Sequence, residues 1–187
     1  MGGNRVKRWD GRFTAIVFIL LFVCIGKTLA LECPISLNTS NDQLYPDISG
    51  EKIVWENDGG THDIHLFDIT GGTETRLTPG DPGETTPLIS GSQVVWTEIN
   101  SYNITLLNLT TREARTLTTN GSSPAISGNL VAWVNIENIT ESNISAYDTG
   151  NATQTDMVTE PYDRPNGGQP ALSGGKIVWV NGTDLTA

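Results

Sequence analysis

The sequence contains few of the side chains that build metal or disulfide sites. Its 187 residues include only two cysteines, two methionines and two histidines. A disulfide scaffold, a zinc cluster and a methionine-rich binding surface are therefore poorly supplied. The 20 glycines and nine prolines exclude a coiled coil. The length is that of one domain.

Basic residues are also scarce. The chain has 11 Lys and Arg against 21 Asp and Glu, which gives a formal net charge of -10. Nucleic-acid binding needs a Lys/Arg cluster that displaces phosphate counterions. We therefore expect no nucleic-acid partner, and an acidic surface that favours cations or basic partners.

The first thirty residues have the organisation of an export signal. Arg5, Lys7, Arg8 and Arg12 form a basic head, residues 13–25 form an apolar run, and residues 28–30 supply a small-residue cleavage site. The run is too short to cross a bilayer as a helix. We predict a signal peptide over residues 1–30 and a secreted or cell-surface protein. The alternative is a retained N-terminal anchor, which would be the only contact with the membrane.

Cleavage would make the remaining chain more acidic. It removes five of the 11 basic residues and one of the 21 acidic residues, which leaves a net charge of -14. Eight N-x-[ST] sequons favour a glycosylated exterior, with biased composition as the alternative. They stand at Asn38, Asn103, Asn108, Asn120, Asn138, Asn143, Asn151 and Asn181.

The rest of the chain, residues 31–187, is a repeat. The phrase P-x-[IL]-S-G-x-x-[IV]-x-W occurs at residues 46–55, 87–96, 124–133 and 170–179, with starts separated by 41, 37 and 46 residues. This period excludes leucine-rich and 33 to 34-residue helical repeats and matches the four-stranded blades of a β-propeller.

Strand patterns fill each period. The phrase predicts a short first strand beginning at its proline, a Ser-Gly turn with glycine at positive φ, and a second strand that is apolar on both faces. Alternating segments at 63–68, 103–108 and 143–148 predict third strands. Polar segments at 74–78, 114–118 and 154–159 predict outer edge strands. We expect the four tryptophans of the phrase to form the core between blades.

The order of these segments resembles one known family. Residues 45–55, 63–68 and 75–78 resemble a blade of TolB-like β-propellers, and especially the repeats of archaeal cell-surface proteins. The resemblance covers residues 34 to 187 and implies a secreted, non-enzymatic scaffold. Two features depart from the family, because the usual Ser-Pro-Asp-Gly turn is shortened to Ser-Gly and such propellers usually have six or more blades.

The repeat predicts three complete blades and a partial fourth. Residues 34–38 resemble a lone fourth strand, so the N-terminus is a candidate to complete the last blade and close a ring. The alternatives are an open stack of blades, a partial gene product, or a dimer that builds a larger ring. An open stack would expose apolar faces and associate.

Any binding site is expected on the face that carries the loops between second and third strands and between blades. Its candidate residues are Asp58, Asp81, Glu84, Glu137, Glu141, Glu160, Tyr162, Asp163 and Arg164. The alternative for residues 160–165 is a proline-stiffened linker.

The sequence favours no catalytic group, metal ligand set or cofactor. His62 and His65 lie three residues apart near the start of a strand, which directs their side chains to opposite faces. A plain hairpin turn explains the residues around Asp58 better than a calcium-binding loop does. The sequence contains no G-x-S-x-G motif of the kind that positions a catalytic serine.

We therefore predict a non-catalytic interaction scaffold with an unknown protein or envelope partner. The alternatives are a propeller carbohydrate-active enzyme or lyase and a truncated propeller fragment without independent function.

Overall fold

The computed structural model describes residues 41–80, 83–136, 142–157, 169–181 and 184–186. The predicted export signal and the predicted strand at residues 34–38 lie outside them. By its contacts the chain divides into two units, Met1–Pro34 and Ile35–Ala187, and every described residue belongs to the second. In this described part, no helix is long and apolar enough to span a membrane.

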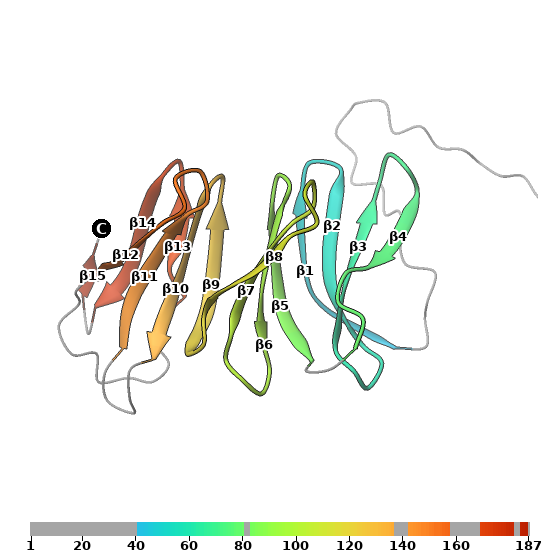
Figure 1. The fold of residues 1–187 in the computed structure, drawn as a ribbon, viewed down its shortest axis with the longest axis horizontal. Coiled ribbons are helices and arrows are strands. Elements are labelled where there is room, and N and C mark those ends of the chain that lie inside the picture. The colour runs from blue at the N-terminus through green and yellow to red at the C-terminus, as the bar shows by residue number, and fades with distance from the viewer. Residues whose placement is uncertain (1–40, 81–82, 137–141, 158–168, 182–183, 187) are drawn as a thin grey trace, which may run out of the picture. The chain divides into compact units, whose positions relative to one another are not determined.

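The described residues form three four-stranded antiparallel sheets and a three-stranded fourth, each in chain order (Figure 1). The first sheet consists of β1 (Asp42–Ser49), β2 (Lys52–Asp58), β3 (Asp63–Asp68) and β4 (Thr73–Arg76). The second consists of β5 (Glu84–Ser90), β6 (Gln93–Glu98), β7 (Ile104–Asn108) and β8 (Ala114–Thr118). The third consists of β9 (Gly121–Ser127), β10 (Leu130–Ile136), β11 (Ser142–Asp148) and β12 (Thr153–Met157), and the fourth of β13 (Ala171–Ser173), β14 (Lys176–Asn181) and β15 (Asp184–Thr186). The prediction of three complete units and a partial fourth is confirmed.

The glycine of each phrase makes the first turn of its sheet. Gly50, Gly91, Gly128 and Gly174 have φ between 54° and 59°, a left-handed conformation that other residues adopt only with strain. The predicted Ser-Gly turns are therefore confirmed.

The first strands are longer than predicted. Pro46, Pro87 and Pro124 lie inside β1, β5 and β9 and not at their starts. The pairing register shifts beside each proline, and the preceding residue has a φ of 50° or 51°. A β-bulge at this point accommodates a residue that cannot donate to the ladder, so the strand continues through its proline.

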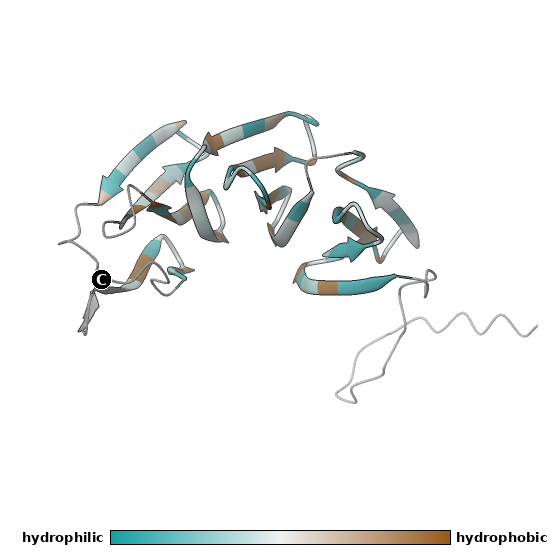
Figure 2. Cartoon of the chain, turned by 90° about the horizontal axis from the view of Figure 1, so that it is seen from below, coloured by the Kyte–Doolittle hydropathy of each residue, from teal (hydrophilic) through white to brown (hydrophobic). Residues whose placement is uncertain are grey.

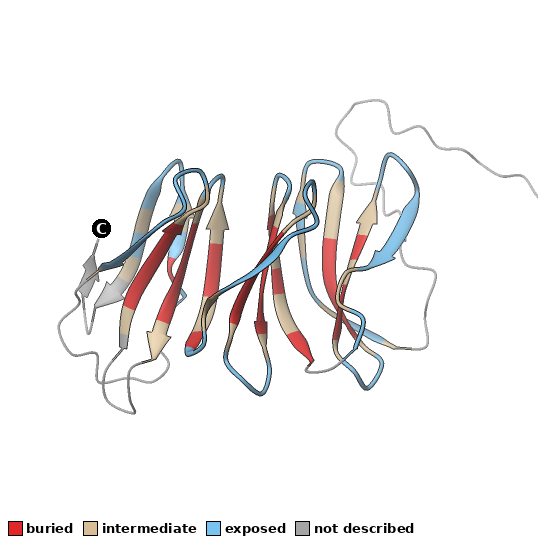
Figure 3. Ribbon diagram, in the orientation of Figure 1, coloured by how far each residue is buried: buried red, intermediate tan, exposed pale blue. Residues whose placement is uncertain are grey.

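The core lies between successive sheets (Figures 2 and 3). Trp96 of the second sheet packs with Val54 and Ile64 of the first, and Trp133 of the third packs in a cluster with Val95 of the second. Trp179 packs against the corresponding cluster of the third sheet. The tryptophans of sheets two to four thus form the inter-sheet core that the repeat predicts.

Trp55 occupies the same position in the first sheet but faces away from the second. Its side chain is 3% exposed and its ring lies 5.7 Å from the ring of His65 in the same sheet. Among the described residues no sheet precedes the first one.

Gly121 of the third sheet packs tightly against the second sheet. A Cβ atom at this residue would lie 2.6 Å from Thr118 Cγ2 and 2.7 Å from Ile104 Cγ1. We expect Gly121→Ala to lower the free energy of unfolding by about 1 to 3 kcal/mol, because the packed sheets must separate to admit a methyl group. Urea unfolding measures this loss. The matched control is Gly71→Ala, whose Cβ would meet nothing nearer than 3.4 Å; equal losses in the two variants would contradict this explanation.

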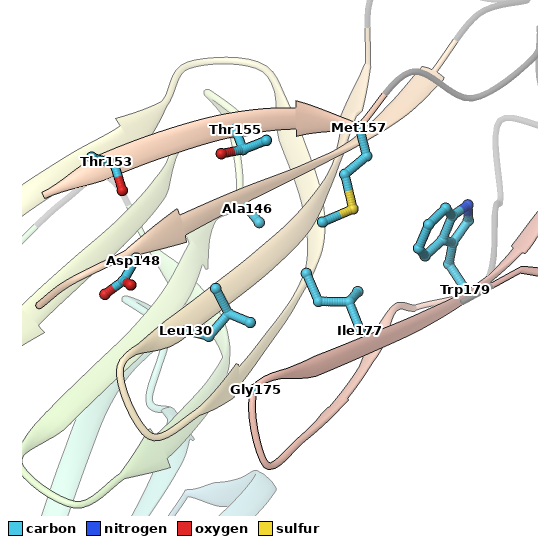
Figure 4. A pocket seen from close by; sticks show the side chains of 9 residues that line it. All are labelled: Leu130, Ala146, Asp148, Thr153, Thr155, Met157, Gly175, Ile177 and Trp179. Atoms are coloured by element: carbon cyan, nitrogen blue, oxygen red, sulfur yellow. The ribbon is translucent and has the colours of Figure 1, made fainter. Parts of the chain in front are cut away.

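The last interface is less completely packed than the others. A hollow of about 520 Å³ lies between the third and fourth sheets, and Met157 and Ile177 point toward each other across it (Figure 4). Ile177 and Trp179 are half-buried there, whereas Val131 and Trp133 at the preceding interface are fully buried.

Candidate interaction face

The two ends of the sheets differ in their connections. The β1–β2 and β3–β4 turns lie at one end, and the β2–β3 loop lies at the other (Figure 1). Among the described segments, the β6–β7 loop and the connection from β8 to β9 lie at this second end as well, and we call it the loop end. Asp42 at the start of β1 pairs there with Asp58 at the end of β2.

The structure tests only part of the predicted acidic rim. Asp58 lies at the loop end, and its side chain is 37% exposed. Glu84 does not belong to an exposed rim: it lies in β5 and is 5% exposed, because the strand begins earlier than its proline. The other predicted rim residues lie outside the described residues, namely Asp81, Glu137, Glu141, Glu160, Tyr162, Asp163 and Arg164.

A group of buried carboxylates joins the first two sheets beneath the loop end. Glu56, the residue after the phrase tryptophan, is 2% exposed. Its Oε1 lies 2.7 Å from His62 Nδ1, and its Oε2 accepts a hydrogen bond from Thr85 Oγ1 of the second sheet at 2.6 Å. The backbone N–H of Glu84 donates to the His62 carbonyl at 2.7 Å. Glu56 and His62 therefore hold the start of β5 against the first sheet.

Asp63 is the second buried carboxylate and is 5% exposed. It accepts hydrogen bonds from Thr61 Oγ1 at 2.5 Å and from Arg76 at 2.6 Å. Burial pushes the pKa of Asp63 upward, but the hydrogen bonds from Thr61 and Arg76 outweigh it and hold the pKa below its usual value. This carboxylate is ionised and paired.

Glu84 has a different environment. Burial raises the pKa of its carboxyl to about 7, and the negative charges of Asp63 and Glu98 act in the same direction. Its Oε2 is buried without a hydrogen-bond partner. His62 has a raised pKa because its ring bonds to Glu56. Both shifts favour the protonated form of the group.

The cluster does not form a metal centre. Within the described ranges, no group of three or more His, Cys, Asp or Glu side chains is arranged to hold a metal ion. The two histidines have separate carboxylate neighbours, since His65 Nδ1 lies 2.7 Å from Glu74 and His62 Nδ1 lies 2.7 Å from Glu56. The predicted separation of His62 and His65 is confirmed.

Exposed aromatic and aliphatic side chains occur near the carboxylate group. Tyr102, just before β7, is 54% exposed, and Ile99 is 36% exposed. Tyr102 has a φ of 53° and matches His62, whose φ is 50°, in the repeat. A left-handed conformation at a bulky residue is strained and persists only where the surrounding structure fixes it. The loop therefore fixes the backbone at Tyr102, whose side chain is exposed.

Tyr45 adds a second exposed ring, on the bulge of β1. It is 55% exposed and has a φ of 50°. Thr86 and Ser123, at the matching bulges, each have a φ of 51°. These bulges border a hollow of about 360 Å³. It is lined by Tyr45, Pro46, Thr86, Pro87, Leu88, Ser123, Pro124 and Gln169.

The sequons differ in accessibility. Asn151 and Asn120 are exposed, whereas Asn103, Asn108 and Asn143 are half-buried. The amide of Asn103 donates to Glu98 at 2.6 Å, and that of Asn151 donates to Asp148 at 3.0 Å. Asn38 and Asn138 lie outside the described residues, and of the side chain of Asn181 nothing is described.

Solved structures show which fold these sheets form. TolB from Acinetobacter baumannii matches with a TM-score of 0.57 and 21% identity, over 77% of this chain and 39% of that chain. The β-propeller domain of the Trilobed protease from Pyrococcus furiosus matches with a TM-score of 0.54 and 15% identity, over 74% of this chain and 48% of that one. The computationally designed Ika4 protein matches with a TM-score of 0.53 and 15% identity, over 80% of this chain and 93% of that one.

These likenesses confirm the prediction of an all-β, propeller-type fold, and the resemblance to TolB holds at the level of the fold. The chain spans less than half the length of the TolB chain that it matches. No protein-family model and no curated protein matches the sequence.

Proposed function

We propose that this chain is an exported, non-catalytic β-propeller module that binds a protein partner through its loop end. The observation that carries the proposal is the exposure of Tyr102 in the β6–β7 loop at this end, where the backbone has a left-handed φ of 53°. An exposed tyrosine on a fixed backbone supplies a large contact area at a low cost in conformational entropy, and tyrosine is enriched in binding hot spots.

The chemistry of the surrounding residues indicates the kind of partner. Asp42 and Asp58 lie at the same end of the first sheet and leave it acidic, and Ile99 adds an aliphatic contact near Tyr102. An end that carries both acidic and exposed apolar side chains suits a partner with basic and apolar side chains. Export is proposed from the basic head, the apolar run and the cleavage site of residues 1–30.

Binding assays with a defined variant test the proposed face. Purified envelope and extracellular proteins are screened by biolayer interferometry, with a panel of polysaccharides in parallel. For a protein that binds, we expect Tyr102→Ala to weaken the affinity about tenfold or more, as truncation of a hot-spot residue does. The matched control is Thr116→Ala, which changes an exposed residue of the outer strand β8 and should leave the affinity unchanged.

Two results would overturn the proposal. Turnover of a polysaccharide would show an enzyme. Equal affinity of wild type and Tyr102→Ala for every protein that binds would place the contact elsewhere on the molecule.

A further inference from the structure

The three interfaces within the chain are copies of one contact. Each sheet has a leading face, which carries the phrase tryptophan and meets the sheet before it, and a trailing face, which meets the sheet after it. The residues of the leading face occupy equivalent positions in the paired strands of each sheet. They are Ile89, Val94, Trp96 and Leu107 in the second sheet, Ile126, Val131, Trp133 and Tyr147 in the third, and Leu172, Ile177 and Trp179 in the fourth.

Polar contacts repeat along with this packing. The N–H of Gly91 donates to Ser49 Oγ at 2.9 Å, and the N–H of Gly128 donates to Ser90 Oγ at 2.9 Å. The N–H of Ile89 also donates to Asp47 Oδ2 of the first sheet at 2.8 Å. At the first two interfaces the serine of one phrase thus accepts a hydrogen bond from the glycine of the next. Every phrase contains both residues.

The first sheet presents a leading face of the same composition. Its residues at the matching positions are Ile48, Ile53, Trp55 and Phe67. Pro46 is exposed, whereas Pro87, Pro124 and Pro170 are fully buried. Ile48 is 60% exposed, whereas Ile89 at the same position is 5% exposed. Trp55 is buried, so the open part of this face is its inner edge, along β1.

The fourth sheet presents the complementary trailing face. Val178 is 38% exposed, whereas Val54, Val95 and Ala132 at the same position are fully buried. Ala171 and Ser173 beside it are exposed. A hollow of about 540 Å³ lies over β13 and β14. The first and fourth sheets lie at opposite ends of the row of sheets (Figure 2).

We propose that the leading face of the first sheet binds the trailing face of the fourth sheet in a second copy of this chain. The contact repeats, along β1, the inner part of the interface that the chain forms between its own sheets, with Ile48 packing beside Ala171 and Val178. The N–H of Gly50 then donates to Ser173 Oγ of the partner copy, as Gly91 donates to Ser49. Such a head-to-tail contact closes into a larger ring if its rotation permits and otherwise extends.

Cysteine crosslinking between two differently labelled chains tests this contact. In a background with Cys24→Ser and Cys33→Ser, one chain carries Ile48→Cys and the other carries Ala171→Cys. These positions correspond to Ile89 and Asp47, which a hydrogen bond of 2.8 Å joins within the chain. We expect mild oxidation of the mixed proteins, recovered from an exporting host, to give a mixed disulfide-linked dimer.

Sedimentation velocity with charged variants gives an independent readout. We expect Ile48→Glu to raise the self-association Kd at least about tenfold, because association would bury an unpaired carboxylate. The matched control is Ile69→Glu, which changes an isoleucine that is 40% exposed in the β3–β4 turn and should leave the Kd unchanged. Thermal melting verifies that both variants fold.

The possible results are distinguishable. A mixed dimer together with dissociation by Ile48→Glu alone supports the proposal. A monomer at all concentrations overturns it. A third chain carries both Ile48→Cys and Ala171→Cys; a disulfide that forms within this chain but never between two chains also overturns the proposal, because the two faces would then meet in one molecule. Association that Ile48→Glu and Ile69→Glu weaken equally also overturns it.

Discussion

Replacing Trp133 by alanine is expected to lower the free energy of unfolding by about 3 to 5 kcal/mol, the range for large aromatic residues in a packed core. Trp133 is fully buried between the second and third sheets, in a cluster with Val95, Ile104 and Leu106. Its removal leaves a cavity lined by strands of two sheets, and neither sheet can close the cavity without losing pairing.

Equilibrium unfolding in urea measures the effect of Trp133→Ala. The matched control is Trp179→Ala, at the same place in the phrase but half-buried beside the hollow of the last interface. We expect the control to lose less than half as much free energy, because less of its ring is removed from water. Equal losses would contradict the account of the interfaces, and so would a loss below about 1 kcal/mol in Trp133→Ala.

Replacing Glu84 by glutamine is expected to remove a pH dependence of stability. In the folded protein the pKa of Glu84 is raised from 4.5 to about 7 by burial. A raised pKa means that the folded state binds a proton more tightly than the unfolded state. The stabilisation is therefore fully present below about pH 4.5 and is lost as the pH rises through about 7. Wild type should lose about 2 to 3 kcal/mol from this group between pH 5 and pH 8.

Urea unfolding at pH 5 and pH 8 isolates this effect as a difference between wild type and Glu84→Gln. The free energy of unfolding of Glu84→Gln minus that of wild type should be about 2 to 3 kcal/mol larger at pH 8 than at pH 5. Glu51→Gln, at an exposed glutamate in the β1–β2 turn, is the control and should follow wild type. If Glu84→Gln follows wild type instead, the buried carboxyl is not protonated near neutral pH.

The repeated phrase was sufficient to predict the sheets. The tryptophan and the Ser-Gly turn recur in all four periods and the alternating third strand in three, so each local pattern was supported by its copies. Polar outer strands followed from the sequence as well, and Thr73–Arg76 and Thr153–Asp156 are exposed. These features depend on contacts within one sheet, which neighbouring residues encode.

Contacts between sheets were harder to predict. Ser49 and Gly91 form a hydrogen bond across two sheets, but within the sequence each has the pattern of a simple turn residue. The bulge before Pro46, Pro87 and Pro124 was missed because a proline is usually taken as the start of a strand. The longer strand that results carries Glu84 into the interior.

The acidic residues show why the candidate site was only partly predicted. A glutamate in a Gly/Pro-rich connection is expected at the surface, and that expectation was wrong for Glu84. Glu56 and Asp63 can be buried because Thr85, His62 and Arg76 bind their carboxylates. These partners come from β5, the β2–β3 loop and β4. The sequence does contain a signal for the two exposed tyrosines. Tyr45 directly precedes the proline of its phrase, and Tyr102 directly precedes the predicted third strand at residues 103–108.

In sheets two to four, the phrase tryptophan packs against the sheet before it. Nuclear Overhauser contacts of the indole protons of Trp96 and Trp133 in the folded protein measure this packing. We expect contacts from Trp96 to the methyl groups of Val54, which lies in the same core cluster, and from Trp133 to the methyl groups of Val95, which shares the next cluster. Indole protons that contact only residues of their own sheet would contradict this packing.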